Sequence, residues 1–265
     1  MVLDDAAAVW ELDGDFAVPS GFARGPWSAD AQHGGAPSAL LAGLLERFAP
    51  GPADFTVRLG IDLMRPVPLR PLRVERVVVR PGKKVQIVQG SLFDGEVEVV
   101  RATALRIRTV DEPYGDVVPS DLVHPLPPPG EVMAFPFVFE GATGFWNAVE
   151  VRSPDGVGEL ALGRGAAWFR LRMPVIAGEE PSPLQRVAAV ADFANGVTLA
   201  GVGSGYTFIN PDLTIVVHRL PVGEWIALDA SSFPEDAGIG VAESELHDER
   251  GRFGRALQTI ILERT

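Results

Sequence analysis

The sequence predicts an α+β protein made of two copies of one domain, each a helix packed against a curved antiparallel sheet. The first observation is a repeat: residues 55–108 and 212–264 both read as strand, turn, strand, turn, strand, Asp/Gly hairpin and long strand. The second is an apolar helix pattern ahead of each set of strands. The third is that both sets are rich in Val, Ile, Leu and Arg between turn residues, which is typical of antiparallel hairpins.

The spacing of the two copies indicates a duplicated domain. They lie about 154–156 residues apart, more than half of the 265-residue chain, which excludes a short-period repeat. The alignment makes the second hairpin two residues longer and places Gln258 opposite Ala102. The alignment of the two copies rests on five positions: Val85, Ile87, Leu92, Asp94 and Gly95 align with Ile239, Val241, Leu246, Asp248 and Gly251.

Each copy has a helix before its strands. The first is expected over Gly34–Phe48 and the second over Ser182–Gly196. Ser182 is a good N-cap, Pro183 suits the first helical position, and Gly196 is a good stop.

The chain therefore divides into three parts. Residues 1–110 form an N-terminal domain and residues 141–265 a C-terminal domain. Residues 111–140 are rich in proline, which predicts an extended linker without a helix or strand of its own.

Composition excludes several classes of protein. Hydrophobic residues make up 46% and charged residues 22%, so a packed core is expected rather than disorder. A net charge of -12 argues against nucleic-acid binding, and the absence of cysteine excludes disulfides and thiolate metal sites. The chain starts without a signal-peptide pattern and has no apolar stretch near the ~20 residues of a membrane span, so a cytoplasmic protein is expected.

Four scattered histidines (His33, His124, His218, His247) show no metal spacing.

Four segments carry a resemblance to a known family. Residues 33–47, 181–196, 208–232 and 254–264, taken in order, resemble the double hot-dog acyl-CoA thioesterases of the thioesterase II type. The resemblance implies two fused hot-dog domains, each a long central helix wrapped by a curved antiparallel sheet. It also implies hydrolysis of acyl-CoA without a metal or redox cofactor, coenzyme A thioester being the substrate. Further association of the chain into a homo-oligomer is expected.

The family uses an Asp on the second helix, a Thr-like residue opening the next strand and a Gln on the last strand. Motif by motif, these positions fall on Asp192, Asn210 and Gln258. Asn replaces the Thr of better-known members, although an amide can also donate and accept a hydrogen bond.

Each of these residues also has a structural interpretation. Asp192 lies at the rim of an apolar helix stripe, where it is either a solvated surface charge or a partly dry general base with a raised pKa. Gln258 is a polar residue on an apolar strand, and either caps a loop carbonyl or serves the site. Asn210 precedes Pro211, a common way to open a turn.

Substrate contacts are predicted at the first helix and at one hairpin. Gly34 and Gly35 leave helix N–H groups open to the thioester oxygen, next to His33, which is otherwise a helix-start residue without chemistry.

The only two lysines, Lys83 and Lys84, follow Arg80 in a tight turn. This turn either holds coenzyme A phosphates or is an exposed hairpin whose charge prevents edge aggregation.

Two other functions stay open. One is an acyl or acyl-CoA binding protein without catalysis, built on the same fold. The other is a hot-dog hydratase, which is disfavoured because the sequence lacks the Asp and His about five residues apart that those enzymes use. The spacing of Gly201, Gly203 and Gly205 matches neither a hydrolase nucleophile turn nor a dinucleotide site.

Overall fold

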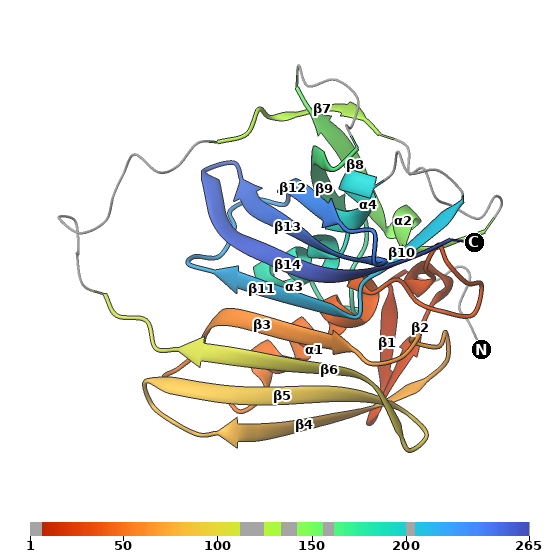
Figure 1. The fold of residues 1–265 in the computed structure, drawn as a ribbon. Helices are drawn as coiled ribbons and strands as arrows, with labels where there is room; N and C mark the ends of the chain where they lie inside the picture. The colour runs from red at the N-terminus through yellow and green to blue at the C-terminus, as the bar shows by residue number, and fades with distance from the viewer. Residues whose placement is uncertain (1–6, 112–124, 134–141, 156–161, 200–204, 265) are drawn as a thin grey trace.

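A computed structural model of the chain describes residues 7–111, 125–133, 142–155, 162–199 and 205–264. Within these residues, fourteen strands pair into one antiparallel sheet (Figure 1). The strands of the first half are β1 Trp10–Asp13, β2 Phe16–Pro19, β3 Phe55–Leu63, β4 Leu72–Arg80, β5 Val85–Asp94 and β6 Val97–Ile107. Those that follow are β7 Pro129–Val132, β8 Val149–Pro154, β9 Arg164–Leu171, β10 Tyr206–Ile209, β11 Asp212–Val217, β12 Ile226–Pro234, β13 Ile239–Asp248 and β14 Gly251–Arg264. The helices are η1 Gly21–Ala23, α1 Gly35–Arg47, α2 Phe145–Ala148, α3 Pro183–Ala191 and α4 Ala194–Leu199.

The two halves of the sheet meet where β3 pairs with β11. The order is β1-β2-β4-β5-β6-β3-β11-β14-β13-β12-β9-β8-β7, with β10 paired to β14. The run β3-β6-β5-β4 is thus repeated as β11-β14-β13-β12 on the other side of the β3–β11 seam. The repeat expected from the sequence is present as an approximate twofold arrangement about this seam.

The hairpins of the two copies have the same length. Leu92 pairs with Val100 on β6, and Leu246 pairs with Gly254 on β14, so each partner lies eight residues farther along the chain. The predicted two-residue difference is therefore wrong, and a constant spacing of 154 residues relates the four long strands of the two copies.

This spacing changes the counterpart of Gln258. Ala102 corresponds to Ala256, because both pair with the equivalent isoleucine of the seam strands. The first-copy counterpart of Gln258 is consequently Ala104 and not Ala102, as the sequence alignment predicted. The first copy still lacks the amide.

Helix α1 confirms the expectation for the first helix, and its residues Gly35–Leu45 are all buried between sheet and α3. The second helix begins as predicted. The Ser182 hydroxyl accepts the Gln185 N–H at 3.1 Å, and the Gln185 side chain accepts the Ser182 N–H at 3.0 Å. This reciprocal capping fixes the start of α3.

The second helix ends earlier than the sequence predicts. Asp192 is the C-cap of α3, the Phe193 N–H bonds to the Val190 carbonyl, and the chain then resumes as α4. Gly196 lies inside α4, so its predicted role as the stop is wrong. Two helices of 13 and 9 residues take the place of the long central helices that the resemblance implied.

The ends of α1 and α3 meet because the helices pack antiparallel. At one end the Ser182 hydroxyl bonds to the Glu46 carboxylate, and at the other Gly35 packs against the Ala189 carbonyl. The C-terminal end of α3, with Asp192, therefore lies against the N-terminal end of α1.

Part of the predicted linker forms a strand. β7 pairs with β8, and the Pro127 carbonyl accepts the Trp168 indole N–H at 2.8 Å. Proline removes N–H donors but leaves carbonyls free, which suits an edge strand. The prediction that residues 111–140 form no element is wrong for this stretch; residues 112–124 and 134–140 lie outside the described part.

The first half also reaches into the second. Trp10 on β1 donates its N–H to the Val175 carbonyl at 2.9 Å and its indole N–H to the Ala36 carbonyl at 3.0 Å. Among the described residues, no helix is both long and apolar enough to cross a membrane.

Candidate active site

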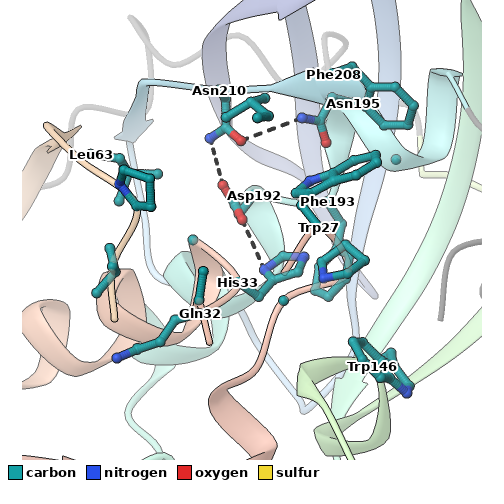
Figure 2. A pocket seen from close by; sticks show the side chains of 18 of the residues that line it. Trp27, Gln32, His33, Leu63, Trp146, Asp192, Phe193, Asn195, Phe208 and Asn210 are labelled. Atoms are coloured by element: carbon teal, nitrogen blue, oxygen red, sulfur yellow. Dashed lines mark hydrogen bonds and ion pairs between the residues drawn. The ribbon is translucent and has the colours of Figure 1, made fainter. Parts of the chain in front are cut away.

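A cavity of about 530 Å³ opens between the two halves, next to the ends of α1 and α3. Its wall is mainly aromatic and aliphatic, with a few polar groups on one side (Figure 2). The larger apolar side chains are Trp27, Leu63, Met64 and Val67 from the first half, and Trp146, Phe169, Phe193 and Phe208 from the second. An apolar cavity with few converging polar groups is typical of a small-molecule site.

Asp192 is the centre of the polar groups and is only 4% exposed. The Asn210 amide donates to its Oδ1 at 2.7 Å, and the Gln258 amide donates to the same oxygen and to the Asp192 carbonyl, both at 3.2 Å. His33 Nδ1 lies 3.0 Å from Oδ2 (Figure 2). The structure thus brings together four of the residues singled out in the sequence, from both halves of the chain.

The sequence left Asp192 as either a solvated surface charge or a partly dry carboxylate, and its burial in the structure excludes the solvated surface charge. Asp192 is buried because α3 ends there and the carboxylate turns toward the start of α1. Asn210 reaches it from the short connection between β10 and β11, and Gln258 from the inner face of β14, where it is fully buried.

His33 is held as a partner of the carboxylate. Its ring lies between Phe145 and Phe193, with centroids 5.1 and 4.4 Å away. Nδ1 is also 3.1 Å from the Gly35 N–H, but one ring nitrogen cannot accept from Gly35 and donate to Asp192 together. Both His33 and the Gly35 amide lower the pKa of Asp192.

Gly34 permits this approach. A Cβ added there would lie 2.8 Å from Oδ2 and 2.9 Å from Oδ1 of Asp192, so any side chain would displace the carboxylate. Gly34 lines the cavity, whereas the Gly35 N–H faces His33 and Asp192. The Gly35 N–H therefore has a partner within the protein and does not hold the thioester oxygen as the sequence predicted. The same role for the Gly34 N–H stays a prediction.

The pKa of Asp192 is lowered, not raised as the sequence suggested. Burial is the largest influence and raises the pKa, but the charge and hydrogen bond of His33, with the Asn210 and Gly35 donors, together outweigh it. The carboxylate is ionised at neutral pH.

This lowered pKa predicts a pH-dependent contribution to stability. It is fully present above the ordinary aspartate value of about 3.9 and is lost as the pH falls through the lower native pKa. The free energy of unfolding of wild type minus that of Asp192→Asn should therefore shrink as the pH falls below about 4. Urea unfolding of both proteins at pH 6, 4 and 3 measures it, and a difference independent of pH would contradict the lowered pKa.

The cationic turn lies at the wrong end of the sheet for this cavity. β4 begins near the cavity and ends at Arg80, so the turn carrying Lys83 and Lys84 is at the far end, beside Ile107. A nine-residue strand is about 30 Å long. The prediction that this turn holds the phosphates of a substrate bound at Asp192 is therefore wrong.

Two polar residues of the cavity were not predicted from the sequence. Arg65 lines the cavity just beyond the end of β3, and supplies the positive charge that the distant turn does not. Asn195 is buried on α4, and its amide lies 3.5 Å from Asn210 Oδ1. An arginine after a strand and an asparagine in a helix have no distinguishing local pattern; only the fold brings them to the cavity.

Metal ligands do not cluster in the part of the chain that the structure describes: no three His, Asp or Glu side chains there could hold an ion.

Two family profiles match the chain. The acyl-CoA thioesterase N-terminal domain matches residues 23–107, and the acyl-CoA thioesterase C-terminal domain matches residues 120–262. The chain belongs to the acyl-CoA thioesterase family. Both domains of the family are present, in the family's order, and the polar cluster joins them, with His33 from one and Asp192 from the other. No curated protein matches this family member.

Solved structures support the fold of this thioesterase-family chain. A protein from Novosphingobium aromaticivorans, whose name gives thioesterase as a proposed activity, is 20% identical, with 97% of this chain and 100% of that chain covered and a TM-score of 0.74. A hot dog fold protein of unknown function from Alicyclobacillus acidocaldarius is 19% identical, with 98% of each chain covered and a TM-score of 0.70. An acyl-CoA thioesterase II from Mycobacterium marinum is 15% identical, with 96% and 95% covered and a TM-score of 0.65.

Proposed function

We propose that this protein hydrolyses acyl-CoA thioesters to a free acid and coenzyme A, with Asp192 acting on the attacking water. The observation that supports the proposal is that Asp192, Asn210 and His33 line an apolar cavity. The buried Gln258 amide bonds to Asp192 next to them. An ionised, positioned carboxylate beside an acyl-sized apolar space is what water attack on a thioester requires.

The water is expected between Asp192 and Gln258. Gln258 is fully buried, and its Oε1 has no hydrogen-bond partner among the described residues. A buried acceptor of this kind calls for a donor, and a water that donates one proton to Gln258 and the other to Asp192 supplies it. Its lone pair is then free to attack the thioester carbon.

The proton balance of the reaction is simple. Asp192 accepts a proton from the water as the C–O bond forms, and the C–S bond then breaks to release coenzyme A as a thiolate, which takes up a proton. A lowered pKa makes Asp192 a weak base, but a thiolate is a good leaving group, so a weak base is sufficient. We assign the Gly34 N–H to the developing oxyanion because Gly34 lines the cavity at the start of α1.

The acyl chain would occupy the apolar part of the cavity, between Trp27 and Phe169, and Arg65 would meet the phosphate end of coenzyme A. We further propose that the two halves form a double hot-dog, with α1 and α3 as the paired central helices. The sheet order supports this assignment, although both helices are short.

A thiol-release assay against short, medium and long acyl-CoAs tests the proposal. Hydrolysis should appear as free thiol in equal amount with free acid for at least one chain length. Binding of acyl-CoA without thiol release would support the non-catalytic binding protein, and a 3-hydroxyacyl product without free thiol would support the hydratase.

A further inference from the structure

A second depression lies at the opposite end of the β3–β11 seam. Both halves line it: Phe55, Val57, Ile107, Arg108 and Thr109 from the first, and His218, Arg219 and Leu220 from the second. It shares no residue with the cavity at Asp192.

The duplication relates this depression to the mouth of the cavity. With the 154-residue spacing, the residues at one end of the seam have counterparts at the other. Phe55, Val57, Ile107, His218, Arg219 and Leu220 of the depression correspond to Ile209, Pro211, Ile261, Met64, Arg65 and Pro66 of the cavity. The depression is thus the second copy of the same mouth.

The second mouth lacks the groups needed for hydrolysis. The counterparts of Asn210 and Gln258 are Thr56 and Ala104, so no pair of amides faces it. Beneath it the fully buried Arg106 donates to the Phe48 carbonyl and to Gln86, both at 2.9 Å, and occupies the interior. This end therefore lacks the pair of amides that bond to Asp192 at the catalytic end.

Its charge differs from that of the rest of the protein. Met64 and Leu262 at the catalytic end are replaced here by His218 and Arg108. The Arg108 N–H bonds to the Lys84 carbonyl at 3.0 Å, which joins the turn of Lys83 and Lys84 to the edge of the depression.

No carboxylate of the described residues lies within ion-pair distance of Arg108, Lys83 or Lys84, whereas Arg219 is paired with the buried Asp248. Unpaired cations gathered on a chain of net charge -12 attract an anion of high charge.

We propose that this depression is a non-catalytic site for a nucleoside diphosphate. The phosphates lie on Arg108 and the turn of Lys83 and Lys84, since guanidinium and ammonium groups bind phosphate oxygens by charge-assisted hydrogen bonds. The base lies against the apolar side chains of the depression, Phe55, Val57 and Leu220. The proposal does not depend on hydrolysis at Asp192.

Titration calorimetry with ADP on the full chain tests the site. Wild type should bind ADP, and the double substitution Arg108→Glu with Lys83→Glu should weaken binding at least about tenfold, the scale of losing one charged hydrogen bond. Both residues are exposed, so the variant should unfold at the wild-type temperature. Arg65→Glu, the counterpart change at the catalytic mouth, is the matched control and should leave this ADP binding in place.

Three results would overturn the proposal: no ADP binding by wild type, unchanged binding in the double variant, or loss of all binding in Arg65→Glu. Inorganic pyrophosphate separates the two parts of the ligand. Weaker binding of pyrophosphate than of ADP supports contact with the base, and equal binding would contradict the assignment to a nucleoside.

Discussion

Asp192→Asn is expected to lower acyl-CoA turnover by at least about 10²-fold, the scale of losing a general base. The amide has nearly the same shape as the carboxylate, but it cannot accept a proton from water. In one of the two orientations of the new amide, its N–H groups would face the N–H donors of Asn210 and Gln258. Steady-state thiol release on the substrate identified in the chain-length screen measures the effect.

A surface change of the same chemistry serves as the control. Asp62→Asn removes an exposed carboxylate from β3 without touching the cavity and should retain wild-type turnover. Circular dichroism of both variants shows whether the fold is kept. Turnover near wild type in a folded Asp192→Asn protein would remove Asp192 from the proposed mechanism.

Gly35→Ala is expected to destabilise the protein by about 1–3 kcal/mol, the usual cost of overpacking a core. A Cβ on Gly35 would collide with the Ala189 backbone carbonyl and lie 2.8 Å from the Phe145 ring, so α1 and α3 would have to separate. Because Asp192 ends α3 next to this contact, turnover should fall as well. Urea unfolding measures the change in the free energy of unfolding.

Gly196→Ala is the matched control for stability. Gly196 is also helical, but a Cβ there would meet no atom within 4 Å. Alanine is favoured over glycine in a helix by roughly 0.5–1 kcal/mol, so this variant should be as stable as wild type or slightly more stable. Equal stability of the two variants would contradict the close packing of α1 on α3 at Gly35.

Much of the fold follows from local signals. Ser182 and Pro183 mark the start of α3 through capping and a fixed backbone angle, and both act over one turn of chain. The hairpins and the repeat of strands follow likewise from alternation and turn residues. The end of α3 does not, because a glycine inside a helix and a glycine after one look alike in sequence, and packing at Asp192 decided between them.

The candidate site could be predicted only in part. Asp192, Asn210 and Gln258 were found through the resemblance, and the structure places the two amides within hydrogen-bond distance of Asp192. The pairing of His33 with Asp192 had no signal in sequence, since the two are 159 residues apart and meet only where α1 and α3 cross. The predicted role of the cationic turn was wrong because charge composition does not tell which end of a strand faces a cavity.

The sequence by itself determined the duplication, most strands of each copy and the first helix, because these depend on neighbours within a few residues or on comparison of the copies. The polar groups were identified through the family resemblance of the sequence. Tertiary structure alone decided the burial and lowered pKa of Asp192, the need for glycine at position 34 and the different chemistry of the two ends of the seam. These properties depend on distances between segments far apart in the chain, and on the balance of desolvation against hydrogen bonds that such distances set.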